Sequence, residues 1–280
     1  MTEQWQTIQE KIEDADAILC GIGSGMSSSA GYNHYHKNSF FEENFSEFEE
    51  QYGYDNLFQG FYHVYPTPEQ QWAYYAKYIQ MMYHAPAGKA YEDLKQMLSR
   101  KEYHILTTNV DMQLSKVFPE DKVFCFQGDF RYLQCCQPCN DEIYPGIELI
   151  NQMVGKTKHL QVPTELIPRC PECGWKMVPW VQDDTFLHGS YWKKQEKEYH
   201  TFLEKYMDKK LVLLELGVGR MTPMFIQEPF WNYTYQMPNA FYITINPKDA
   251  LLPRELAQKG LAIKEDIGCV LENAVTNKKK

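Results

Sequence analysis

Two pairs of closely spaced cysteines have the types and spacing of a metal site. Cys135 or Cys136 stands near Cys139, and further along the chain Cys170 and Cys173 form a second pair. Four thiolates within reach of one ion make a closed tetrahedral zinc site that leaves no position for water. Zinc here should therefore hold a module together and take no part in catalysis. The alternative is a set of reduced thiols without metal, and the first pair offers three thiols for two positions.

A glycine-rich turn follows the first apolar segment and could bind phosphate. It covers residues 21–26, with the sequence Gly-Ile-Gly-Ser-Gly-Met. Glycines let backbone amides approach a phosphate, and the start of the next helix favours an anion. A dinucleotide is therefore the natural ligand, although the dehydrogenase pattern G-x-G-x-x-G fails because its last position is Met26 or Ser28. The alternative is a tight turn that binds nothing.

Polar residues and glycines also gather where other expected strands end. Because the carboxyl ends of parallel strands line the ligand crevice of an open α/β sheet, these residues are candidates for one shared site. Each alone is more typical of a turn or a helix cap, but together with the glycine-rich turn they favour a site. They are Thr107, Thr108, Asn109, Asp111, Gln127, Asp129, Gly217, Gly219, Arg220 and Asn246.

Short apolar runs predict the strands that must position these residues. Near-continuous apolar strands that alternate with helices favour a parallel sheet covered on both faces. The expected strands lie at residues 15–20, 104–111, 123–126, 211–219 and 241–246, and the segment up to residue 275 should hold a helix and then a strand.

Helical spacing and start signals predict the helices between the strands. Thr67 and Pro68 form a helix start, because Thr caps free amides and Pro suits the first helical position. Residues 32–65 are aromatic and aperiodic and predict short helices and loops, while residues 131–180 contain no long periodic segment. Further helices are expected before residue 15 and over residues 193–210. Apolar residues at helical spacing mark two more helices: Trp72, Tyr75, Ile79 and Met82 in the first, and Ala90, Leu94, Met97 and Leu98 in the second.

The composition is that of a folded globular protein. Of 280 residues, 44% are hydrophobic and 15% aromatic, more than a solvated tail carries. The net charge of −9 repels phosphate backbones and argues against a general nucleic-acid binder. No apolar run reaches the roughly 20 residues that span a bilayer, and the first residues lack a signal-peptide pattern. We therefore expect a cytoplasmic protein that binds neither nucleic acid nor membrane, with Cys20, Cys125 and Cys269 as small core residues.

The order of these motifs resembles the sirtuin family of NAD-dependent enzymes. The glycine-rich turn with Gly31, the segment 107–111 (Thr-Thr-Asn-Val-Asp), the two cysteine pairs, the segment 217–219 and Ile245-Asn246 follow the family's sequence of motifs. The resemblance spans nearly the whole chain. It implies an α/β fold with a Rossmann-like, doubly wound parallel sheet and a smaller domain. The large domain would comprise residues 1–32, 101–130 and 181–280, and the small one the helical insertion 33–100 and the zinc module 131–180.

The sequence departs from the family where the catalytic base belongs. Gln127-Gly128 stands where sirtuin deacylases carry a His-Gly pair, and His188-Gly189 follows the cysteine pairs, in the wrong order to replace it. The family's I-P-D-F-R segment is replaced by residues 32–35, Tyr-Asn-His-Tyr. An amide side chain can hydrogen-bond a hydroxyl but cannot take its proton near neutral pH. Deacylation should therefore be impaired.

Release of nicotinamide needs no such base, so the resemblance implies transfer of ADP-ribose to a nucleophile on a partner. Gln127 and the run 216–231 are similar to the macrodomain-linked branch of microbial sirtuins. That branch implies mono-ADP-ribosylation of a lipoylated carrier protein similar to the glycine cleavage H protein, reversed by a macrodomain hydrolase. The alternatives are a slow deacylase in which another group, such as a nearby histidine, replaces the base, and a non-catalytic NAD-sensing module.

The resemblance also assigns roles to residues. Structural zinc would bind Cys135, Cys139, Cys170 and Cys173, since the branch has a three-residue gap in its first pair. Asn109, Asp111 and Gln127 would be catalytic. The NAD-binding residues would be Gly23, Ser24, Gly25, Met26, Ser27, Thr108, Asn109, Asp111, Gln127, Gly217, Val218, Gly219, Asn246 and Ile267.

Overall fold

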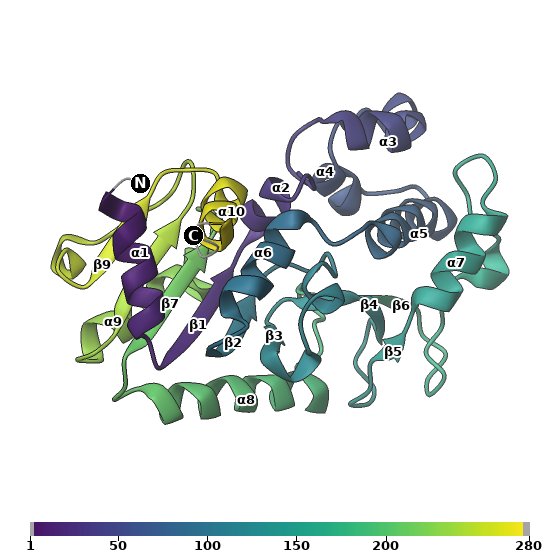
Figure 1. Cartoon of the computed structure of the whole chain (residues 1–280). Helices are drawn as coiled ribbons and strands as arrows, with labels where there is room; N and C mark the ends of the chain where they lie inside the picture. The colour runs from purple at the N-terminus through teal and green to yellow at the C-terminus, as the bar shows by residue number, and fades with distance from the viewer. Residues whose placement is uncertain (1–2, 277–280) are drawn as a thin grey trace.

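A six-stranded parallel sheet forms the larger part of the molecule (Figure 1). The computed structural model describes residues 3–276. The strand order is β3-β2-β1-β7-β8-β9, and every neighbouring pair is parallel. The strands are β1 (Ala17–Ile22), β2 (Glu102–Thr107), β3 (Val123–Cys125), β7 (Leu211–Leu216), β8 (Phe241–Ile245) and β9 (Gly260–Ile263). The predicted parallel sheet is confirmed, and β1, β2, β7 and β8 are followed directly by residues of the predicted site, namely Gly23, Thr108, Gly217 and Asn246.

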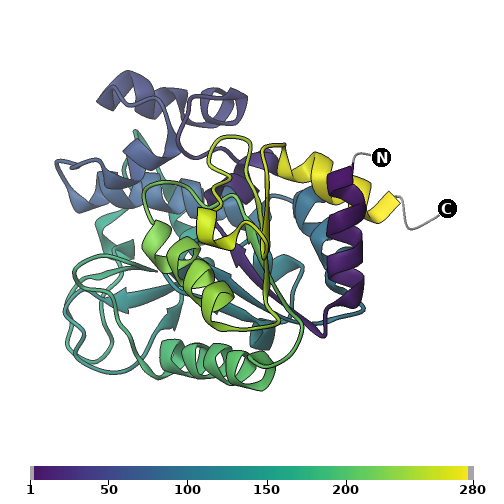
Figure 2. The same ribbon diagram turned by 90° about the vertical axis from the view of Figure 1, so that its left-hand side faces the viewer.

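Helices cover both faces of this sheet, because the strands are apolar on both faces. In β1, Ile18 and Cys20 pack toward one cluster of buried residues and Ala17 and Leu19 toward another. The first face carries α1 (Glu3–Asp14), α6 (Lys89–Leu98) and α10 (Ile267–Thr276), and the second carries α8 (Ser190–Tyr206) and α9 (Gln227–Gln236). Figure 2 shows α1 and α8 on different sides of the sheet. Within residues 3–276, no helix is long and apolar enough to cross a membrane.

The smaller part of the molecule combines helices with a three-stranded antiparallel sheet of order β5-β4-β6. It lies at the end of the molecule opposite α1 and β9 (Figure 1). Its aromatic residues form a core of their own, in which Phe41, Phe45 and Tyr74 are fully buried. Its elements are α3 (Ser39–Tyr52), α4 (Leu57–Tyr62), α5 (Pro68–His84), β4 (Gly128–Cys135), β5 (Tyr144–Pro145), α7 (Ile147–Lys156) and β6 (Met177–Val181).

Local sequence signals placed several boundaries well and missed others. Thr67 caps α5, and its hydroxyl accepts from the backbone amide of Gln70, as predicted. The prediction was wrong at the end of the chain, where β9 precedes α10. It was also wrong for Cys269, which is exposed on α10, whereas Cys20 and Cys125 are buried. Short segments complete the fold: α2 (Ser24–Ser29) and the 3-10 turns Leu114–Lys116, Glu120–Lys122, Thr164–Leu166, Pro223–Phe225 and Arg254–Leu256.

The strand β4 joins the two parts of the molecule. It starts at Gly128, directly after Gln127, and ends at Cys135. The predicted boundary at residue 131 therefore falls inside this strand. One continuous strand consequently links Gln127 to Cys135 of the first cysteine pair.

Candidate active site

A cavity of about 400 Å³ lies at the carboxyl ends of β1 and β2, between the two parts of the molecule. Eight of the residues predicted to bind the cofactor line it: Gly23, Ser24, Ser27, Thr108, Asn109, Asp111, Gln127 and Gly219. The other six, Gly25, Met26, Gly217, Val218, Asn246 and Ile267, are not among its lining residues. The structure thus places most of the predicted cofactor-binding residues on the wall of one cavity.

The predicted residues outside the lining hold the walls in place. Asn246 uses its whole side chain: Nδ2 donates to the carbonyl of Val218 (2.9 Å), and Oδ1 accepts from the amides of Lys248 (3.0 Å) and Asp249 (3.1 Å). Met26 and Ile267 belong to the buried core beside the sheet. These residues shape the cavity from behind its surface.

Two glycines let the loops after β1 and β7 meet backbone to backbone. The amide of Gly25 donates to the carbonyl of Gly217 (2.9 Å), and Gly217 has φ 66°, in the left-handed region that glycine tolerates. A Cβ on Gly25 would lie 2.7 Å from the Cα of Gly217. Close packing of two chain segments is thus a reason for glycine here, in addition to the approach of a phosphate.

Gly25→Ala should lower the free energy of unfolding by about 1–3 kcal/mol, because an added methyl group here meets backbone that must shift. The matched control is Gly155→Ala in α7, where an added Cβ meets nothing within 4 Å. That change should be neutral or slightly stabilising, because alanine favours helix. Urea unfolding of the two variants checks the difference, and equal midpoints would contradict the loop contact.

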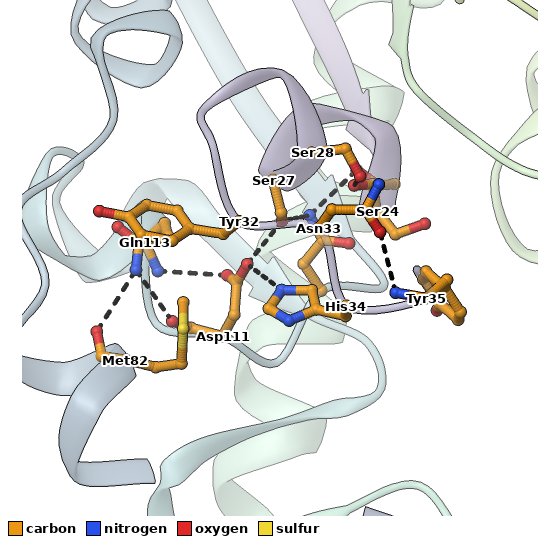
Figure 3. Close-up of polar contacts among 12 residues, drawn as sticks. Ser24, Ser27, Ser28, Tyr32, Asn33, His34, Tyr35, Met82, Asp111 and Gln113 are labelled. Atoms are coloured by element: carbon orange, nitrogen blue, oxygen red, sulfur yellow. Dashed lines mark hydrogen bonds and ion pairs between the residues drawn. The ribbon is translucent and has the colours of Figure 1, made fainter. Parts of the chain in front are cut away.

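Asp111 lies at the centre of a hydrogen-bond network (Figure 3). Its Oδ2 accepts from the Ser27 hydroxyl (2.5 Å) and lies 3.3 Å from His34 Nε2, and its Oδ1 accepts from the Gln113 amide (3.3 Å). Burial raises the pKa of the Asp111 carboxyl, but the hydrogen bonds of His34, Ser27 and the Gln113 amide outweigh it and hold the pKa below its usual value. The next residue, Met112, has φ 65°, a conformation that side chains larger than glycine rarely adopt. Asp111 is thus a fixed, ionised carboxylate.

Asn109 lines the cavity, and its side-chain amide is fixed by hydrogen bonds. Its Nδ2 donates to the carbonyl of Gly23 (3.0 Å) and to the Ser27 hydroxyl (3.1 Å), and its backbone amide donates to Thr107 Oγ1 (3.0 Å). Within residues 3–276, Oδ1 accepts no hydrogen bond. An amide held in this way can accept a hydrogen bond from a ligand hydroxyl or a water.

Gln127, the residue predicted to replace the histidine of sirtuin deacylases, lines the cavity. Its backbone carbonyl accepts from the amide of Gln182 (2.9 Å), and Gly128 after it has φ 93°. In the part of the chain described, the side-chain amide of Gln127 makes no hydrogen bond, so it is free to contact a ligand. The other histidine that precedes a glycine, His188, is exposed and does not line the cavity. The centre of its ring lies 4.5 Å from that of Trp192.

The sequence analysis missed one wall of the cavity, which comes from residues 34–78. His34 was noted there only as a departure from a motif, yet its buried ring contacts Asp111 directly. The available signal was a histidine soon after the glycine-rich turn, but the aperiodic sequence gave no direction for its side chain. The missed lining residues are His34, Tyr35, His36, Phe58, Phe61, Tyr62 and Tyr78 from this wall, with Val110, Phe130, Val181, Gln182, Met221 and Thr222.

The four predicted metal ligands come together away from the cavity. Cys135 Sγ lies 3.6 Å from Cys173 Sγ, Cys139 Sγ lies 3.5 Å from Cys170 Sγ, and all four sulfurs are within 4.8 Å of one another. Four sulfurs around zinc would be roughly 3.8 Å apart, so the set fits this ion. The backbone amide of Cys173 lowers the pKa of the Cys170 thiol to about 7, which favours the thiolate. Cys136 is not part of the cluster, which favours Cys135 as the fourth ligand.

Comparisons with known proteins agree on fold and chemistry. No protein-family model matches the chain. A curated protein ADP-ribosyltransferase of Staphylococcus aureus strain Mu50 is 34% identical over 286 residues, covering 99% of this chain and 88% of that protein. A probable bifunctional ADP-ribose hydrolase/ADP-ribosyltransferase of Fusarium oxysporum f. sp. cubense is 26% identical over 93% of this chain and 46% of that protein. The chain thus spans about half the length of this second relative.

Solved structures share the fold at low sequence identity. A Sir2 homologue in complex with NAD has a TM-score of 0.64 at 16% identity, covering 98% of this chain and 93% of that one. Sir2Tm bound to a propionylated peptide has a TM-score of 0.64 at 13% identity, covering 99% of each chain. The same architecture, a parallel sheet with a smaller domain beside it, is therefore found in both.

Proposed function

Because the chain belongs to the protein ADP-ribosyltransferases and has the fold of the Sir2 proteins, we propose that it transfers one ADP-ribose group from NAD to a lipoylated carrier protein. The proposed carrier is similar to the glycine cleavage H protein. The observation that carries the proposal is Gln127, a cavity-lining amide without a proton-accepting group at the position of the deacylase base.

The cavity offers groups for the diphosphate and for the nicotinamide ribose of NAD. The glycine-rich turn at Gly23 and Ser24 would bind the diphosphate together with Arg220, the lining residue with a fixed positive charge within residues 3–276. Arg220 Nε donates to Asp249 Oδ1 (3.0 Å), which leaves its terminal amino groups for phosphate oxygens. The zinc, when bound, would hold the small domain together and take no part in the chemistry.

Asn109 and Asp111 would act on the ribose that carries nicotinamide. As nicotinamide leaves, positive charge develops on the ribose, and the buried carboxylate of Asp111 would stabilise it. The free oxygen of Asn109 would orient a ribose hydroxyl or the attacking group. Gln127 would hydrogen-bond the ribose without removing a proton, so the deacylase route past this step would stall.

The acceptor side of the cavity is apolar and suits an aliphatic arm. Phe58, Phe61, Phe130 and Val181 line it, and Tyr62 and Met221 line it while remaining 56% and 64% exposed. A pocket with apolar walls and few polar groups binds a long hydrocarbon chain well. A lipoyl arm has this character, and the carrier protein would remain outside the cavity.

Intact-mass analysis tests the proposal. After incubation of the purified protein with NAD, the lipoylated carrier should gain the mass of one ADP-ribose, while the same carrier without lipoyl should gain far less. An acyl-lysine peptide in a parallel reaction should keep its acyl group. Loss of that group with an unmodified carrier would overturn the proposal and support the slow deacylase.

The variant Gln127→His serves as the matched comparison. If the amide is what blocks deacylation, this variant should acquire activity on the acyl-lysine peptide and still release nicotinamide. An unchanged pattern of products would show that Gln127 does not decide the outcome.

We further propose a hydrolase partner that removes the ADP-ribose, of the macrodomain class that the resemblance implies. The bifunctional name of the Fusarium relative joins hydrolase and transferase in one protein and supports this pairing. Reversal would make the modification a regulatory one.

A further inference from the structure

Three side chains on the cavity wall form a continuous chain of hydrogen bonds. The hydroxyl of Tyr78, on α5, lies 3.0 Å from His34 Nδ1, and His34 Nε2 lies 3.3 Å from Asp111 Oδ2. All three residues line the cavity, with exposed fractions of 5%, 9% and 4%. A neutral imidazole fits this chain when the Tyr78 hydroxyl donates to Nδ1 and Nε2–H donates to the carboxylate. This is the order hydroxyl, imidazole, carboxylate known from catalytic triads.

The surroundings keep each group in the form that this chain needs. Burial, and then the charge of Asp111, raises the pKa of Tyr78 well above its usual value, so its hydroxyl stays protonated. The pKa of Asp111 is lowered on balance, and Ser27 and the Gln113 amide fix its oxygens. The ring of Tyr78 is held by Phe130 at 5.3 Å between ring centres.

We propose that Tyr78, His34 and Asp111 form a proton relay that accepts the proton of the attacking group during transfer. The inference rests on the proposed function and adds its missing base. The attacking atom loses its proton to the Tyr78 oxygen as the proton of Tyr78 moves to His34 Nδ1. The attacking atom bonds to the ribose carbon, the bond from that carbon to nicotinamide breaks, and its electron pair leaves with nicotinamide. The imidazolium that results is paired with the Asp111 carboxylate and later releases its proton to solvent.

Other groups at the cavity are less suited to this step. Gln127 has no basic atom, and the carboxylate of Asp111 alone is too weak a base with its pKa lowered. The charged or titratable groups that face His34 and Tyr78 are Asp111, Tyr35 and Tyr62. The pKa of both Tyr35 and Tyr62 is raised, chiefly by burial. His36, which is exposed at the cavity, is the rival base.

The test measures nicotinamide release and carrier modification from pH 5.5 to 9 for wild type, Tyr78→Phe and His34→Gln. The rate of carrier modification by the wild type should fall at acid pH, because an imidazolium accepts no proton. This fall is the acid limb of the pH profile. Both variants should be slowed about 10²-fold, the usual size of a general-base contribution, and should lose this acid limb. The Kd for NAD should change less than threefold. Tyr83→Phe, on the same helix with an exposed ring, should behave as wild type.

Two results would overturn the relay: an acid limb unchanged in both variants, or an acid limb removed by His36→Gln and retained in His34→Gln. Water can replace the carrier as the attacking group, so the relay is tested even if the carrier stays unmodified. In that case nicotinamide release still reports on the relay, while the missing mass gain rejects the acceptor.

Discussion

Asp111→Asn should lower the rate of nicotinamide release about 10³-fold, the upper end of the effect of removing one preorganised electrostatic group. The carboxylate is buried, is ionised because its pKa is lowered, and is fixed by Ser27, His34 and the Gln113 amide. Asparagine keeps the size of the side chain but removes the charge that opposes the positive ribose. Single-turnover release of nicotinamide, with NAD saturating, measures the effect on the chemical step.

The control for this variant is Asp141→Asn, an exposed carboxylate that accepts from the amide of Ser190 far from the cavity lining. It should keep nearly full activity.

The pH dependence of stability gives a second check on the charge of Asp111. Because the folded pKa of Asp111 is lowered, its stabilisation is complete above the unfolded carboxyl pKa of about 3.9 and is lost as the pH falls toward the folded value. At pH 7 the free energy of unfolding of the wild type should thus be larger than that of Asp111→Asn. This difference should shrink as the pH falls below 4. A constant difference would contradict the role of the charge.

Removal of zinc should unfold the small domain and abolish activity. Structural zinc contributes on the order of 10 kcal/mol to small metal-binding folds, which is comparable to the total stability of an ordinary domain. The cavity should be lost too, because β4 carries Phe130 of the cavity wall and ends at the ligand Cys135. A chelator, or Cys170→Ser, should lower the thermal midpoint and the helix signal together with the zinc content.

Cys136→Ser is the matched control for the metal site, because Cys136 lies beside a ligand but outside the cluster. It should retain one zinc per chain and full thermal stability, whereas Cys135→Ser should lose both. The opposite result would assign the fourth ligand to Cys136. Zinc content by mass spectrometry and thermal unfolding by circular dichroism measure the two properties side by side.

Local sequence patterns predicted the elements that are marked by their own residues, such as an apolar run or a helix cap. Apolar runs gave five of the six parallel strands, all except β9, and the Thr67-Pro68 signal gave the start of α5. Other elements depend on contacts that the sequence does not show. α7 lies between prolines and glycines, and its buried Ile150 and Met153 belong to the core shared with α5. α3 is 14 residues long in a segment predicted to hold only short helices, and its buried face is formed by Phe41, Phe45 and Phe48.

The residues of the candidate site also fall into a group that the sequence predicted and a group that it did not. Asn109, Asp111 and Gln127 lie within a few residues of the ends of β2 and β3, so the sheet places them near one edge. His34 and Tyr78 lie on a loop and a helix of the insertion, and only the packing of this insertion against β4 brings them to the cavity. The second function of the glycines was also hidden, because Gly25 and Gly217 meet only in the folded chain.

The position of β1 has a consequence for biosynthesis. Ala17 in this central strand pairs with Glu102 of β2 on one side and Leu211 of β7 on the other. A ribosome therefore releases the first apolar strand long before its second neighbour exists. Sheets with such distant pairings fold slowly, and unpaired apolar strands aggregate in the meantime. Until β7 has emerged, one edge of β1 lacks its partner, so we expect slower translation at low temperature to favour recovery of the native protein.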